Sequence, residues 1–176
     1  MVDGEGNTTK SAEHIPSQDR VSRLTLDITG IAPESLFPFR FDPKTGLRAE
    51  SVFWRKYAPD IADIHRRGCV WQMNKNTAHA EKGRPHVEYI GARTSQVASV
   101  RGIKGEGGHT LGVVHCEEHG DIAHAEIRVE PASGMPAKKL KNQLVELRHH
   151  LVLAFGDLEP HKCDQSDLSV DDVIAT

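Results

Sequence analysis

The sequence has few of the residues that would identify a class of protein directly. Aromatic residues make up only 5% of its 176 residues, and the three cysteines, Cys69, Cys116 and Cys163, lie far apart. An odd number of widely spaced cysteines argues against a disulfide framework and favours a reducing compartment. No apolar run approaches the roughly 18 residues that cross a membrane, and the start of the chain lacks a signal-peptide pattern. We therefore expect a cytoplasmic protein with no membrane partner.

The net charge is also small, whereas histidine is abundant. The formal net charge is only -3, so the protein has no global field that attracts nucleic acid, and we do not expect duplex nucleic acid as a partner. The chain contains 11 histidines, whose side chains titrate near neutral pH and are common metal ligands. The positions of these histidines must decide whether they carry chemistry.

The two ends of the chain differ from its middle. Residues 1–20 are polar and show no periodicity, which predicts a disordered N-terminal tail. Residues 157–176 are rich in aspartate and predict a solvated acidic C-terminal tail. We expect residues 21–156 to form a single α+β domain, because a segment of this length can bury a core without disulfides or metals.

Hydrophobic periodicity predicts a mainly antiparallel sheet of about five or six strands together with three helices. A strand over 21–28 comes first, followed by two short helices over 48–57 and 60–67, the second ending at Gly68. After Pro136, leucines at helical spacing predict an amphipathic C-terminal helix that packs on the sheet and ends at Gly156. The remaining strands are predicted over 69–73, 85–90, 96–103, 109–116 and 122–129, and 96–103 also fits a helical turn.

The segment from His109 to Val129 predicts a β-hairpin rich in histidine. Its two alternating runs are joined by His119 and Gly120, a pair that can adopt the positive φ angles of a type I′ turn. A two-residue turn sets the register, and this register places His115 directly opposite His124. Alternation then puts both histidines on the polar face of the hairpin, together with Glu126.

Two kinds of chemistry fit this polar face. Paired histidines beside a carboxylate can transfer protons, so His115, His124 and Glu126 are candidate catalytic residues. His86 and Glu88 share one face of their own strand, and if that strand lies nearby they would join His115 and His124 as ligands of a metal such as zinc. The alternative is an ordinary half-exposed sheet face, where each cross-strand pair contributes only about 0.2–1 kcal/mol.

A second combination of ligands would form a structural zinc clip. Cys116 and His119 would combine with His115 or His124, and His161 and Cys163 could join from the C-terminal tail. The predicted register places Cys116 on the apolar face, opposite the histidines, so a clip of this kind requires a distorted hairpin.

Residues 101–108 form a glycine-rich loop that contains Arg101 and Lys104. Successive backbone N–H groups in such loops can bind phosphate, and two cations would strengthen the binding. The loop matches neither the P-loop nor the dinucleotide fingerprint, and a flexible hairpin loop is the alternative.

Two functions follow from these patterns. The first is a hydrolase that acts on a nucleotide or another phosphorylated small molecule by histidine acid–base or metal-assisted chemistry. The second is a non-catalytic accessory, adaptor or immunity-type protein that binds a protein partner. A chain with an acidic C-terminal tail suits a partner with a basic surface.

Overall fold

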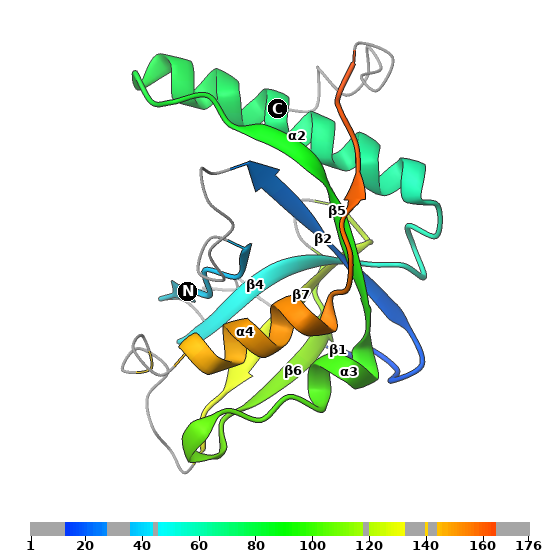
Figure 1. Ribbon diagram of the computed structural model, residues 1–176, viewed down its shortest axis with the longest axis vertical. Helices are drawn as coiled ribbons and strands as arrows, with labels where there is room; N and C mark the ends of the chain where they lie inside the picture. The colour runs from blue at the N-terminus through cyan, green and yellow to red at the C-terminus, as the bar shows by residue number, and fades with distance from the viewer. Residues whose placement is uncertain are drawn as a thin grey trace, which may run out of the picture.

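The computed structural model describes residues 13–27, 36–43, 46–117, 120–132, 140 and 144–164. Within these residues the protein is α+β, with eight strands in one antiparallel sheet of order β1-β6-β7-β4-β2-β5-β8, and β3 pairs with β4 outside this path (Figure 1). The strands are β1 (Glu13–His14), β2 (Arg20–Asp27), β3 (Arg40–Asp42), β4 (Leu47–Trp54), β5 (Glu88–Gln96), β6 (Thr110–His115), β7 (His124–Glu130) and β8 (Glu159–Pro160), and the helices are α2 (Ile61–Glu81), α3 (Val97–Arg101) and α4 (Val145–Ala154).

One face of the sheet is covered by α3 and α4. The predicted leucine stripe is confirmed as the core of this side, because all four of its leucines are fully buried: Leu140, Leu144, Leu147 and Leu151. They pack in one cluster with Val52 of β4 and Ile127 of β7. Helix α4 begins only at Val145, and residues 133–139 and 141–143 lie outside the described residues.

The opposite face is covered by the long helix α2. Its first turn is capped by Asp60, whose side chain accepts a hydrogen bond of 3.0 Å from the backbone N–H of Ala62. The prediction that Gly68 ends this helix is wrong, and so is the strand predicted over 69–73, because α2 runs through both. Gly68 lets α2 pack closely against Tyr89, because a Cβ atom at this position would lie 2.5 Å from Cζ of the tyrosine ring.

Two further sequence predictions fail in local conformation. Residues 48–57 were predicted to be helical, but most of them belong to β4, where buried Val52 and Trp54 flank the half-buried Phe53. Strand β4 pairs with β2 and β7, and the alternation of its side chains buries one side of the strand. Tertiary packing therefore overrides the helical spacing of the apolar residues. Residues 97–101 form α3, which is the helical-turn alternative, and the strand predicted over 85–90 begins at Glu88.

The fold extends into both of the segments that the sequence predicts to be tails. Ile15 is fully buried beside β1, which pairs with β6, so residues 13–20 belong to the fold. At the other end, β8 pairs with β5 and approaches it closely at Gly91, where φ is +142° and no side chain intervenes. Short polar segments like these carry no hydrophobic pattern, and the sheet edge supplies their partners. Residues 1–12 and 165–176 lie outside the described residues.

No helix in the described part of the chain is both long and apolar enough to cross a membrane.

Candidate functional site

The hairpin of β6 and β7 forms as predicted, but with a different register. His115 lies opposite Ala125, and Val113 lies opposite Ile127. The predicted pairing of His115 with His124 is therefore wrong by one residue. Because side chains alternate along a strand, this shift places the two histidines on opposite faces of the sheet.

The connection between the strands explains the shift. Asp121 forms a turn of its own, since its Oδ1 accepts a hydrogen bond of 2.9 Å from the N–H of Ala123 and its carbonyl accepts one of 3.1 Å from the N–H of His124. Side-chain turns of this kind are typical of aspartate and lengthen the connection beyond two residues. Gly120 does have a positive φ of 78°, whereas His119 lies outside the described residues.

His115 belongs to the face that carries α4. Its Nε2 is 2.8 Å from the carbonyl oxygen of Ile122, and its ring lies 5.1 Å from the ring centroid of Trp54 and 5.6 Å from that of Tyr57. These contacts fix the ring as part of the packing around Trp54, so His115 and His124 do not form one acid–base pair.

His124 is 7% exposed and lies between a backbone carbonyl and a serine hydroxyl. Its Nδ1 is 2.8 Å from the carbonyl oxygen of Cys116, and its Nε2 is 3.1 Å from Oγ of Ser51. A carbonyl only accepts hydrogen bonds, so Nδ1 carries the proton of the neutral ring. Nε2 then presents a lone pair to Ser51, whose hydroxyl donates. The thiol of Cys116 is also close, with Sγ 3.4 Å from Nδ1.

Ser51 is the site residue that the sequence analysis missed. It is exposed on β4, between buried Glu50 and buried Val52, and it lies directly opposite Glu126 of β7. The period-two alternation of β4 was the signal that could have found it. The helical interpretation of 48–57 placed Ser51 on a helix, far from any histidine of the hairpin.

Glu126 supplies a carboxylate beside this serine, as part of an ion pair. Its Oε2 accepts a hydrogen bond of 2.8 Å from Nε of Arg128, and both side chains are partly exposed, at 26% and 21%. Arg128 lies on the same face as Glu126, two residues further along the strand. On this face β7 therefore supplies a carboxylate and a guanidinium beside Ser51, and Nη1 of Arg23 donates a hydrogen bond of 2.9 Å to the carbonyl of Ser51.

Arg101 and Lys104 do not lie beside His124 in the sheet. Arg101 extends from α3 to the start of the fold, donating to the carbonyl of Val113 at 2.9 Å and to Oγ of Ser17 at 3.4 Å. Lys104 is exposed and forms an isolated backbone bridge with Thr110. Arg101 thus links α3 to β6 and to the segment after β1.

His86 and Glu88 are not brought together with the hairpin histidines. Strands β4 and β2 separate β5 from β7, so Glu88 lies three strands away from His124. His86 precedes β5, and its Nε2 is 3.2 Å from Nδ2 of Asn76 on α2. The predicted four-residue metal set is therefore dispersed over the sheet.

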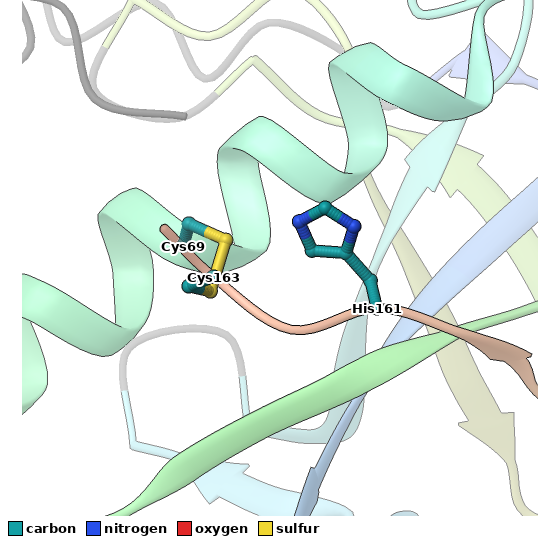
Figure 2. A group of neighbouring side chains, drawn as sticks. All are labelled: Cys69, His161 and Cys163. Atoms are coloured by element: carbon teal, nitrogen blue, oxygen red, sulfur yellow. A yellow bond between two sulfur atoms is a disulfide. The ribbon is translucent and has the colours of Figure 1, made fainter. Parts of the chain in front are cut away.

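A different group of ligand-type side chains does converge, at the contact of α2 with the segment after β8 (Figure 2). Cys69 and Cys163 form a disulfide with a Cα–Cα distance of 5.5 Å, although the number and spacing of the cysteines argued against a disulfide framework. They are 94 residues apart, and spacing in sequence carried no sign of their contact. With His161 they form the only group of three or more metal-ligating side chains within the described ranges, with ligand atoms all within 4.8 Å of one another. We call these three residues the Cys–His cluster.

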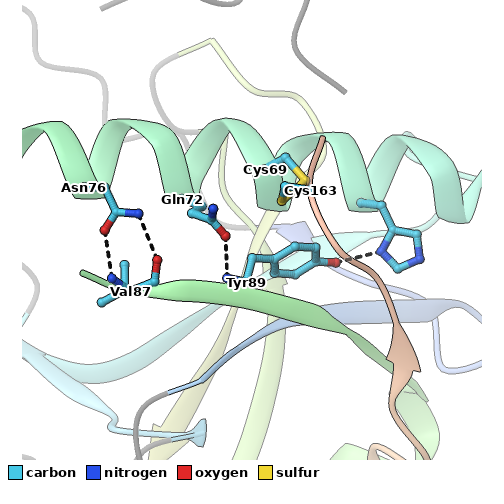
Figure 3. The surroundings of a disulfide bond; sticks show 7 residues. Cys69, Gln72, Asn76, Val87, Tyr89 and Cys163 are labelled. Atoms are coloured by element: carbon cyan, nitrogen blue, oxygen red, sulfur yellow. Dashed lines mark hydrogen bonds between the residues drawn. A yellow bond between two sulfur atoms is a disulfide. The ribbon is translucent and has the colours of Figure 1, made fainter. Parts of the chain in front are cut away.

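Two hydrogen bonds and one ring stack hold the cluster in place. The backbone N–H of His161 donates to the carbonyl of Ile90 at 3.0 Å, and its ring stacks on His65 with centroids 4.4 Å apart and planes 9° apart. Nδ1 of His65 is in turn 2.8 Å from the hydroxyl of Tyr89, which lies beneath α2 (Figure 3). The cluster therefore lies on the face of the sheet that α2 covers, at the edge formed by β5 and β8.

No protein-family model matches this chain, and no curated protein or solved structure is significantly similar to it. The geometry of the described residues is therefore the basis for assigning a function.

Proposed function

We propose that this protein is a hydrolase in which His124 acts as general base toward the hydroxyl of Ser51, with a phosphorylated small molecule such as a nucleotide as its substrate. The observation that carries the proposal is the contact of 3.1 Å between Nε2 of His124 and Oγ of Ser51. The carbonyl of Cys116 supports it by orienting the ring, because a serine is activated when a neighbouring base is held in the correct tautomer by a third group.

The reaction proceeds in two balanced steps. As Oγ of Ser51 attacks the phosphorus, its proton moves to Nε2 of His124, the ester P–O bond breaks, and the imidazolium protonates the departing alcohol oxygen. Water then attacks the phosphoserine while His124 accepts a proton from it, and this proton returns to Oγ of Ser51 as the P–O bond to serine breaks. His124 remains hydrogen-bonded to the carbonyl of Cys116 through both steps.

Exposure favours Ser51 as the reacting group and His124 as the base. Ser51 is exposed and accessible to a substrate, whereas His124 is almost fully buried and therefore held in one orientation. Arg128 lies diagonal to Ser51 on the same face, and diagonal neighbours on adjacent strands are about 7–8 Å apart. We propose that Arg128, rather than Arg101 or Lys104, contacts the phosphate, because its guanidinium matches phosphate geometry.

The test is covalent labelling by a fluorophosphonate probe together with hydrolysis of p-nitrophenyl phosphate. We expect the intact protein to be labelled at Ser51 and to hydrolyse the ester. Ser51→Ala abolishes labelling and lowers kcat/KM by about 10²–10⁴-fold, and His124→Gln has an effect of similar size because the base is removed. Ser99→Ala, which removes an exposed serine on α3, is the matched control and leaves both readouts unchanged.

The two hairpin histidines give a sharper control. His115 lies on the opposite face from Ser51, so His115→Ala should keep the labelling of Ser51 that His124→Gln loses. Full activity in Ser51→Ala would overturn the proposal. A folded protein that neither reacts with the probe nor hydrolyses the ester would support the alternative, an accessory protein that binds a partner with a basic surface.

A further inference from the structure

We propose that the Cys–His cluster binds zinc when its two cysteines are reduced. Zinc held by Cys69, His161 and Cys163 would then replace the disulfide as the link between the C-terminal segment and α2. We call these two alternative links clamps. This inference is independent of the chemistry at Ser51. Its residues come from α2 and from the segment after β8, whereas Ser51 and His124 belong to β4 and β7.

The donor set suits zinc. Two thiolates and one imidazole are soft and borderline ligands that zinc prefers over oxygen donors, and three protein ligands leave one tetrahedral position for water. Their ligand atoms already lie within 4.8 Å of one another, while two thiolates on one tetrahedral zinc are roughly 3.8 Å apart. Small side-chain rotations of the reduced cysteines are therefore enough to form the site.

The surroundings of the cluster hold its ligands and keep them accessible. Cys69 is 2% exposed and forms the inner wall on α2, whereas His161 and Cys163 are half-buried. Figure 2 shows the His161 ring beside the two sulfur atoms, on the same side of α2. Stacking on His65 and the backbone hydrogen bond to Ile90 keep His161 in this position when the disulfide opens. Residues that orient metal ligands in this way raise metal affinity.

The exchange between the two clamps is a balanced redox and acid–base step. A dithiol reductant gives two electrons and two protons to the Cys69–Cys163 bond, which becomes two thiols while the reductant becomes a disulfide. Zinc then replaces the two thiol protons, which are released to solvent, and the neutral His161 ring adds as the third ligand. In the reverse direction a disulfide oxidant takes two electrons from the two thiolates and two protons from solvent and becomes a dithiol, while the Cys69–Cys163 bond forms again and zinc is released.

This exchange makes the docking of the C-terminal segment depend on both redox state and metal. The segment is joined to α2 through Cys163 in the oxidised state and through zinc in the reduced state. Only the reduced, metal-free protein lacks a link at this point, and there the two-residue pairing of β8 with β5 and the noncovalent contacts of His161 hold the segment. Lys162 is exposed between His161 and Cys163 and provides a trypsin site that reports on this docking.

The test compares the full-length chain in its oxidised form with the chain reduced by a phosphine, which becomes phosphine oxide with oxygen from water. Zinc retained after gel filtration is measured by mass spectrometry, and Co²⁺ titration detects thiolate ligands by their charge-transfer absorption. We expect one zinc per chain in the reduced protein and none in the oxidised protein. Zinc should also restore resistance to trypsin cleavage after Lys162.

Three variants decide between this site and adventitious binding to thiols. Cys163→Ser abolishes zinc binding, His161→Ala weakens it at least about tenfold while leaving both cysteines in place, and Cys116→Ser binds zinc as the wild type does. Circular dichroism checks that each variant is folded. Equal zinc binding by oxidised and reduced protein, or unchanged binding in both His161→Ala and Cys163→Ser, would overturn the proposal.

Discussion

The two faces of the sheet are covered by helices that are attached in different ways. On the α4 side, a large apolar cluster of leucine, valine and phenylalanine side chains joins the helix to the strands. On the α2 side the apolar cluster is smaller, and directional contacts supplement it. Gln72 accepts a hydrogen bond of 2.6 Å from the N–H of Tyr89, Asn76 bonds both backbone groups of Val87 at 2.8 Å, and the disulfide lies nearby (Figure 3).

The difference between the faces indicates which side of the sheet can hold reactive side chains in defined orientations. Apolar burial is strong but non-directional, and it dominates the attachment of α4, to which Arg148 adds hydrogen bonds to the carbonyls of Phe37 at 2.9 Å and Pro38 at 3.1 Å. Hydrogen bonds and ring stacking are directional, and they orient His124 toward Ser51 and His161 toward the two cysteines. Both candidate sites accordingly belong to the face that also carries α2.

Removing apolar volume from the α4 side should have the largest effect on stability. Leu147 is fully buried in the main cluster, so Leu147→Ala should lower the free energy of unfolding by about 2–5 kcal/mol through lost burial and a cavity. Urea denaturation measures this loss. Leu153→Ala on the same helix removes a side chain that is 78% exposed and should change stability by less than about 0.5 kcal/mol. Similar losses in the two variants would contradict an apolar attachment of α4.

An added methyl group on the α2 side should have a smaller effect of a different origin. Gly68→Ala places a Cβ against the fully buried ring of Tyr89 and should cost about 1–3 kcal/mol by overpacking, although alanine is the better helix former. The control is Asn74→Ala at an exposed position of the same helix, where propensity alone should leave stability equal or slightly raised. Stabilisation by Gly68→Ala would mean that α2 tolerates a looser contact than the structure indicates.

The smallest effect should come from acid titration at the start of α2. Burial acts to raise the pKa of Asp63, but hydrogen bonds from Arg67 and Arg66 outweigh it and leave that pKa below its ordinary value. A carboxyl with a lowered folded-state pKa stabilises the fold above its unfolded pKa, near about 4, and this stabilisation is lost as the pH falls through the folded value.

Urea denaturation between neutral and acidic pH should separate wild type from Asp63→Asn. We expect the variant to be less stable by about 0.5–1 kcal/mol at pH 7, because these ion pairs are partly solvent-exposed, and the difference should vanish in acid. Asp157→Asn makes the same change of charge at an exposed position and serves as control. A difference that persists in acid would mean that the carboxylate charge of Asp63 is not what stabilises this end of α2.

The sequence predicted the elements whose pattern directly reflects burial. The leucines of the C-terminal segment repeat at helical spacing and are buried together, and the alternating runs of β2, β6 and β7 form strands. Each of these patterns records which side of an element faces the core, and this information is local. The same principle failed over 48–57, where short apolar spacing fits a helix and a strand equally well.

Much of the candidate chemistry was beyond the reach of such patterns. Sequence identified His124 as a candidate base but not Ser51, which is 73 positions away in the chain and meets it only because β4 lies beside β7. It identified His161 and Cys163 as metal ligands but assigned them to Cys116, whereas the chain brings them to Cys69. Gly68 was interpreted as a helix end although its role is to admit the ring of Tyr89.

The sequence by itself thus determined the α+β class, the leucine core and the presence of a histidine-rich hairpin, because each depends on the periodicity of neighbouring residues. Only the tertiary structure decided which residues share a site. The turn at Asp121 shifts the hairpin by one residue and separates His115 from His124, and the return of the chain along β5 brings Cys163 to Cys69. Both outcomes depend on the strand order and on contacts between segments that are distant in the sequence. The packing of the whole domain determines that order and those contacts.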